Sequence, residues 1–142
     1  MAKKIKLLFL CTGNSCRSQM AEGWVRKLKR DSFEPYSAGI EKCMLDPLAV
    51  KVMAEAGVDI FEQSSKTISE LSMKNFDYVI TICDNANKKC PLFPGKAKRI
   101  HNPFDNPSTL AKTLKSEEEV IQLYRRIRDE ILEFVKQMPN NL

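Results

Sequence analysis

The hydrophobic positions of this chain switch between short continuous runs and helical spacing. The first run, residues 5–10, is apolar at every position but one, which predicts a buried parallel strand. After a short polar loop, apolar residues share one face at helical spacing and predict a helix from about Ser18 to Arg30. These residues are Met20, Ala21, Trp24 and Leu28.

The same alternation continues to the end of the chain. We expect a strand at 33–38 closed by Gly39, a helix that Asp46-Pro47 opens and Gly57 ends, a shorter helix at 68–76, strands at 78–82 and 97–100, and a last helix that Ser116 opens. Ser116 with Glu119 fits a capping box. Strands that alternate with helices predict an α/β fold, with a doubly wound, four-stranded parallel sheet and helices on both faces. We expect one domain over residues 1–142.

The loop between the first strand and the first helix carries the candidate chemistry. Backbone N–H groups in such a loop converge on one point, where the following helix N-terminus adds positive potential. Arg17 is suited to grip two oxygens of an oxyanion, and the same field favours the thiolate of Cys11. Ser18 is placed to hydrogen-bond that sulfur. The expected oxyanion cradle consists of Thr12, Gly13, Asn14, Ser15, Cys16 and Arg17. The alternative is a buried structural cysteine before an ordinary helix start. It does not account for a strand, a Cys-x5-Arg loop and a helix in this order.

Composition and charge indicate which partners and which cellular compartment to expect. The net charge is +5 over 142 residues, and no basic block with interleaved aromatic residues occurs, so we expect no nucleic-acid partner. No apolar run is long enough to span a membrane, and no cleavage site follows the first run, so we expect a cytoplasmic protein without membrane contact. Five cysteines in a reducing compartment favour redox or catalytic chemistry over a disulfide scaffold.

A second pair of thiols, Cys83 and Cys90, follows the third strand. Cys83 is expected at the same sheet edge as Cys11. If the polar segment between the pair were helical, about 10 Å would separate the two Cα atoms, whereas a disulfide needs about 4.4–6.8 Å. Pairing would therefore require this segment to change shape. Three interpretations remain open: a redox relay with Cys11, a metal site with His101 whose spacing fits no zinc motif, and two inert residues.

The other two cysteines differ in their surroundings. Cys16 lies inside the loop, where oxidation would join it to Cys11 and protect or inactivate that thiol. Cys43 lies in a connection, and we expect it to be a spectator.

Three parts of the sequence together resemble a known family. They are the run 11–23, the run Tyr36-Ser37-Ala38-Gly39-Ile40-Glu41, and Cys83 with Cys90-Pro91. They are similar to the thioredoxin-coupled arsenate reductases, which share the fold of the low-molecular-weight protein tyrosine phosphatases. The similarity extends to Arg128-Asp129-Glu130 in the last helix.

The resemblance implies a relay of three thiols. The Cys11 thiolate attacks arsenate, Cys83 attacks the Cys11 sulfur so that arsenite leaves, and Cys90 attacks Cys83. Thioredoxin then reduces the Cys83–Cys90 disulfide. The resemblance further implies that no cofactor or metal is bound. We also expect phosphate to compete with arsenate, and the protein to be a monomer.

This sequence departs from the family in its proton donor. The family has Asp before Pro in the loop over the site, whereas Asn106 precedes Pro107 here. Because an amide cannot supply a proton in the same way, we expect Asp105 to substitute. Arsenate brings its own hydroxyl protons, so this departure favours reduction over ester hydrolysis.

A second departure concerns potassium, which some relatives bind beside residues that correspond to Asn14, Glu22 and Ser37, with an Asp after a Thr-Ser pair. Here that place reads Ser64-Ser65-Lys66. We therefore expect the Lys66 ammonium to replace the ion beside Glu22.

Two other functions use parts of the same chemistry. A low-molecular-weight phosphatase would work through a Cys11 phosphocysteine and need neither Cys83 nor Cys90. A redox- or arsenic-responsive binding module would switch disulfides without turnover.

Overall fold

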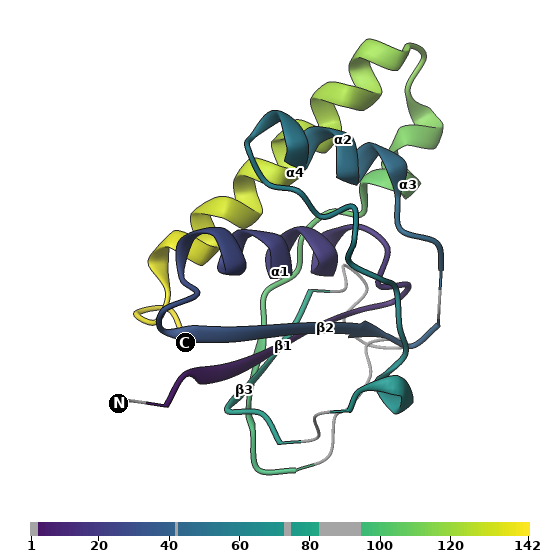
Figure 1. Cartoon of the computed structure of the whole chain (residues 1–142). Coiled ribbons are helices and arrows are strands. Elements are labelled where there is room, and N and C mark those ends of the chain that lie inside the picture. Colours follow the sequence, from purple (N-terminus) through teal and green to yellow (C-terminus); the bar gives the residue numbers. More distant parts are fainter. Residues whose placement is uncertain (1–2, 42, 73–74, 83–94) are drawn as a thin grey trace.

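A computed structural model describes residues 3–41, 43–72, 75–82 and 95–142 of the chain. Its four strands are β1 (Ile5–Cys11), β2 (Phe33–Gly39), β3 (Tyr78–Thr81) and β4 (Lys98–His101). They form one parallel sheet in the order β2-β1-β3-β4 (Figure 1). The predicted four-stranded parallel sheet is therefore confirmed. Since β1 is a central strand, the loop that follows it starts in the middle of the sheet's carboxyl edge.

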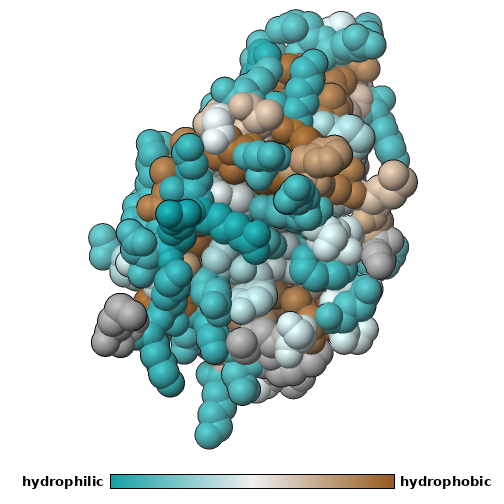
Figure 2. Space-filling model, in the orientation of Figure 1, coloured by the Kyte–Doolittle hydropathy of each residue, from teal (hydrophilic) through white to brown (hydrophobic). Residues whose placement is uncertain are grey.

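The helices are α1 (Arg17–Leu28), α2 (Pro47–Glu55), α3 (Pro107–Leu110) and α4 (Glu117–Gln137), with short 3-10 turns at Ile68–Glu70 and Ala111–Thr113. In Figure 1, α1, α2 and α4 lie on the same side of the sheet. Figure 2 shows hydrophobic side chains gathered on the part of the visible face that carries α2 and α4. Among the described residues, no helix combines the length and the apolar character needed to cross a bilayer.

Strand β1 is buried on both faces of the sheet, as its continuous apolar run predicts. Leu7 and Phe9 pack into the cluster formed with α1, α2 and α4. Leu8 and Leu10 belong to a second cluster on the other face, which includes Phe76. Successive side chains of a strand point to opposite faces, so one short strand supports both layers.

Helix α1 starts and ends close to the predicted bounds, but its buried face differs. Leu28 is 44% exposed, whereas Val25 is fully buried. Gly23 allows close packing, because a Cβ there would lie 2.6 Å from Ile60 Cγ2. The helix therefore approaches the segment after α2 more closely than a side chain would permit.

The predicted helix at 68–76 is wrong. Of the residues described in this range, only Ile68–Glu70 are helical, as a 3-10 turn with a capping box between Thr67 and Glu70. Leu71 has extended dihedral angles (φ −68°, ψ 127°) and is buried in the second cluster. Burial of Leu71 and Phe76 against the sheet thus replaces the helical stripe that the sequence suggested.

Helix α4 begins where predicted, with one difference at its cap. Ser116 Oγ accepts a hydrogen bond from Glu119 N at 3.1 Å, but its hydroxyl, rather than its backbone N–H, donates to the Glu119 carboxylate. The Asp46 cap and the left-handed Gly57 (φ 83°) confirm the predicted limits of α2.

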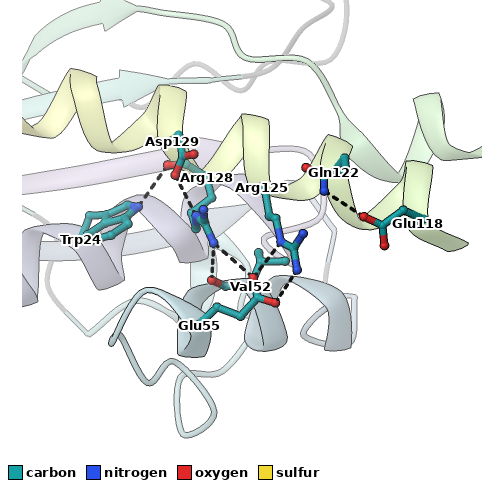
Figure 3. Close-up of polar contacts among 8 residues, drawn as sticks. All are labelled: Trp24, Val52, Glu55, Glu118, Gln122, Arg125, Arg128 and Asp129. Carbon is teal, nitrogen blue, oxygen red and sulfur yellow. Dashed lines mark hydrogen bonds and ion pairs between the residues drawn. The ribbon is translucent and has the colours of Figure 1, made fainter.

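Polar contacts hold α4 against α1 and α2 (Figure 3). Arg128 Nη1 donates to the Val52 carbonyl at 2.9 Å, and the Arg128 carbonyl accepts from Trp24 Nε1 at 3.2 Å. Arg125 makes a bidentate pair with Glu55 at 3.0 and 2.9 Å. These contacts fix the register of α4, whose Tyr124 reaches the site described next.

Candidate active site

A cavity of about 170 Å³ opens beside the carboxyl end of β1. Within the described ranges, three parts of the chain line it: the end of β1 with the loop after it, the connection after β2, and the start of α3. The lining residues are Cys11, Thr12, Gly13, Ser15, Cys16, Arg17, Glu41, Cys43, Asn106 and Ser108. The cavity thus lies at the sheet edge where parallel α/β folds bind ligands.

The loop is held in shape by the buried side chain of Asn14. Its backbone is left-handed (φ 49°), a conformation that asparagine tolerates better than most residues. Its Oδ1 accepts from Gln19 Nε2 at 3.1 Å and from Lys66 N at 2.9 Å. These two donors fix the amide orientation, so that Nδ2 donates to Ser18 Oγ at 2.8 Å.

The sulfur of Cys11 lies against two polar groups of this loop. Asn14 N donates to Cys11 Sγ at 3.2 Å, and Ser18 Oγ is 2.9 Å from the same sulfur. Because Ser18 Oγ already accepts from Asn14, its own hydrogen is directed to the sulfur. Both bonds stabilise a negative charge on Cys11, and the sequence-predicted contact of Ser18 is present.

Arg17 is 3% exposed and lines the cavity. Its Nη1 donates to the carbonyls of Ile82 at 3.1 Å and Phe104 at 2.9 Å. These bonds anchor the guanidinium at the carboxyl end of β3. A buried positive charge fixed in this way is suited to hold an anion in the cavity.

Two glycines allow the neighbouring connection to approach the loop. A Cβ on Gly39 would lie 2.8 Å from both Asn14 N and Thr12 O. A Cβ on Gly13 would lie 2.9 Å from Cys43 Sγ. Cys43, which we expected to be a spectator, therefore lines the cavity, and no pattern in the sequence indicated this position.

Cys16 differs from Cys11 although both belong to the same loop. It is 4% exposed, and burial raises its pKa well above the usual value, with a further increase from the nearby Asp46 carboxylate. Asp46 in turn accepts a hydrogen bond from Tyr124 Oη at 2.6 Å, and its N–H donates to the Ser15 carbonyl at 2.9 Å. Cys16 therefore remains a protonated thiol at neutral pH.

The expectation that Asp105 replaces the family's proton donor is not supported by its position. Asp105 is absent from the described residues that line the cavity, and it pairs with Arg126 at 3.2 Å. Asn106 caps α3, with Oδ1 accepting from Ser108 N at 3.2 Å and Ser108 Oγ at 2.9 Å. This cap directs Asp105 toward α4. Among the described residues that line the cavity, Glu41 is the one with a carboxylate, and the sequence did not indicate it for this role.

Lys66 lies near Glu22, as expected, but a second cation is present. Arg26 pairs with Glu22 at 2.6 Å, and Ser37 Oγ donates to the same carboxylate at 2.5 Å. Lys66 Nζ donates to the Ser64 carbonyl at 2.7 Å. Burial lowers the Lys66 pKa, and the attraction of Glu22 opposes this shift. Two cationic groups therefore stand by the carboxylate.

The second thiol pair, Cys83 and Cys90, lies outside the described residues. His101, which the metal-site interpretation would add to this pair, is within 2.7 Å of Thr81 Oγ1 through its Nδ1. Within the described ranges, His, Cys, Asp and Glu form no group of three suited to a metal ion.

A family model described as low molecular weight phosphotyrosine protein phosphatase matches residues 6–142. The chain belongs to this family. Arsenate reductase of Bacillus licheniformis is 52% identical over 136 residues, which cover 96% of this chain and 95% of that protein. Arsenate reductase of Bacillus subtilis is 49% identical over 131 residues, which cover 92% and 91%.

A solved structure described as an arsenate reductase in the phosphate binding state is also similar. It is 27% identical, has a TM-score of 0.74, and covers 94% of this chain and 95% of that chain. Together these similarities confirm the resemblance to arsenate reductases with the low-molecular-weight phosphatase fold.

Proposed function

We propose that this protein reduces arsenate to arsenite. The observation that carries the proposal is the arrangement of Cys11 on the floor of an oxyanion-sized cavity, with two hydrogen bonds to its sulfur and Arg17 in the wall. Curated relatives at 52% and 49% identity are arsenate reductases. The similar structure in a phosphate binding state supports a tetrahedral oxyanion as ligand.

The first step forms a bond between Cys11 sulfur and arsenic. The thiolate attacks arsenate held by the loop amides and Arg17, and an arsenic-bound hydroxyl leaves as water. Arsenic remains pentavalent in this adduct. The arsenate hydroxyls supply protons, so the step does not depend on a carboxylic acid at position 106.

The next two steps transfer electrons through thiols. Cys83 attacks the Cys11 sulfur, the S–As bond breaks, and its electron pair leaves with arsenic as trivalent arsenite. Cys90 then attacks Cys83, which releases Cys11 as a thiolate and leaves a Cys83–Cys90 disulfide. Thioredoxin reduces this disulfide, and no bound cofactor or metal is required.

Ile82 joins the anion cavity to Cys83 along the chain. Its carbonyl accepts a hydrogen bond from Arg17, and Cys83 is the next residue in the sequence. A reducing compartment such as the cytoplasm would keep all three thiols ready.

Disulfide mapping by mass spectrometry tests the proposal. Fully reduced protein is exposed once to arsenate, with phosphate as the control anion, and then alkylated and digested. We expect a Cys83–Cys90 disulfide and released arsenite after treatment with arsenate, and neither after treatment with phosphate. A Cys90→Ser variant should stop one step earlier, with Cys11 joined to Cys83.

Free thiols after arsenate treatment would contradict the proposal. Release of p-nitrophenol from p-nitrophenyl phosphate by the same preparation would then favour a phosphatase. The leaving alkoxide of an ester needs a proton. Asn106, which stands where the family has its proton donor, lines the cavity and cannot supply this proton, so ester hydrolysis is expected to be slow.

A further inference from the structure

Cys43 has no part in the proposed relay, yet it lines the same cavity as Cys11. Its N–H donates to the Gly13 carbonyl at 3.3 Å and to Ser65 Oγ at 3.1 Å. Ser65 Oγ also donates to the Gly13 carbonyl at 3.0 Å. These bonds hold Cys43 against the loop, and its sulfur packs on Gly13.

Cys43 and Cys11 each approach the loop at neighbouring residues. Cys43 Sγ lies 2.9 Å from where a Cβ on Gly13 would stand, and Cys11 Sγ accepts from the N–H of Asn14, the next residue. Both residues line one cavity of about 170 Å³. Cys11 is 2% exposed at the floor, whereas Cys43 is an exposed residue at the rim.

We infer that Cys11 and Cys43 form a two-thiol site for trivalent arsenic, so that the enzyme binds arsenite at the mouth of its own cradle. The inference rests on the proposed function for the source of the ligand. Trivalent arsenic, unlike the arsenate oxyanion, bonds readily to two thiols. A bridge through arsenic spans more than the single S–S bond of a disulfide, about 2.05 Å, which suits one floor thiol and one rim thiol.

The binding step exchanges ligands without oxidation. Arsenous acid, As(OH)3, loses two hydroxyls. One combines with the proton of the Cys43 thiol to form water, and the Cys11 thiolate displaces the other, which takes a proton from solvent to form water. Two S–As bonds form, one hydroxyl stays on arsenic, and arsenic remains trivalent. Because the bridge occupies the cradle, arsenite should compete with arsenate or phosphate.

Cys16 lines the same cavity but is a poorer partner. It belongs to the hydrophobic core cluster, and its thiol packs near Asp46 and Tyr124 rather than at the rim. A Cys16→Ser variant is therefore the matched control for Cys43→Ser.

The test uses a Cys83→Ser/Cys90→Ser protein, because the relay thiols are themselves a candidate dithiol. The reduced protein is titrated with arsenite and pulsed with an alkylating agent, and peptides containing Cys11, Cys16 and Cys43 are quantified by mass spectrometry. Circular dichroism and the melting temperature confirm that each variant folds. We expect arsenite to protect Cys11 and Cys43 together at a stoichiometry of one arsenic per chain.

The second S–As bond forms within one molecule, so its loss should weaken binding on the order of 10²-fold. Adding Cys43→Ser should therefore raise the arsenite concentration that protects Cys11 by that factor, whereas Cys16→Ser should leave it within about threefold. Alkylation of Cys43 at the arsenite-free rate would overturn the inference. So would a loss of Cys11 protection in Cys16→Ser but not in Cys43→Ser.

This measurement needs no turnover and is separate from the test of the proposed function. Protection of both thiols in a protein that fails to reduce arsenate would support the site while the reductase proposal fails. Reduction of arsenate with unprotected Cys43 would overturn the site alone.

Discussion

Replacing Ser18 with alanine removes one of the two hydrogen bonds to the Cys11 sulfur. The bond is 2.9 Å long, and Ser18 is fully buried, so water cannot take the place of the hydroxyl without rearrangement. A hydrogen bond to a charged group contributes about 1.5–3 kcal/mol. Since 1.36 kcal/mol corresponds to a factor of ten in rate, attack by the Cys11 thiolate should slow about 10- to 150-fold.

The same substitution should also lower stability, because Asn14 Nδ2 donates to Ser18 Oγ and would lose its acceptor. A buried donor without a partner costs about 1–3 kcal/mol. The free energy of unfolding in urea should fall by this amount, which leaves a marginally stable domain folded at room temperature.

The rate at which iodoacetamide alkylates Cys11 at neutral pH measures the first effect, because the thiolate is the reacting species. Ser108→Ala is the matched control, since Ser108 lines the same cavity but its hydroxyl donates to Asn106. We expect the control to react within about twofold of the wild type. Alkylation of a folded Ser18→Ala protein at the wild-type rate would refute the assigned role of this hydroxyl.

Three further predictions concern other parts of the chain. Gly23→Ala should lower the free energy of unfolding by about 1–3 kcal/mol, because the clash with Ile60 outweighs the gain of about 1 kcal/mol in helix propensity; urea titration measures it. Potassium should raise the melting temperature no more than sodium, since Lys66 stands near Glu22; a clear preference for potassium would contradict this. The pKa of Cys16 is raised in the folded state, so its contribution to stability is complete at pH values below 9.0, the usual pKa of a cysteine, and should be lost as the pH rises above 9.0. The free energy of unfolding, measured against pH, should therefore fall more steeply in the wild type than in Cys16→Ala.

Much of the sheet and the anion cradle could be predicted because their signals are local. An apolar run buried on both sides, a loop of fixed spacing and an amphipathic helix each leave a pattern within a few residues. Cys11, Arg17 and Ser18 occupy the expected positions for this reason. Similarly, Asp46 and Gly57 marked the limits of α2, since capping depends on neighbouring residues alone.

Features that depend on contacts between distant segments could not be predicted. Leu71 packs in the second cluster instead of on the face of a helix. Asp105 pairs with Arg126, 21 residues away in sequence. Likewise, Cys43 reaches the cavity only because Gly13 has no side chain. Composition and spacing carry no information about such pairings.

The cradle itself does not distinguish reduction from hydrolysis, since both begin with attack of Cys11 on a tetrahedral oxyanion. What differs is the second nucleophile: water in a phosphatase and a thiol in a reductase. Arg17 serves either reaction, because its guanidinium lines the anion cavity and is held there by the carbonyl of Ile82 at the end of β3. Position 106 does distinguish them: it carries an amide, which cannot protonate the leaving group of an ester, and this favours a thiol as the second nucleophile.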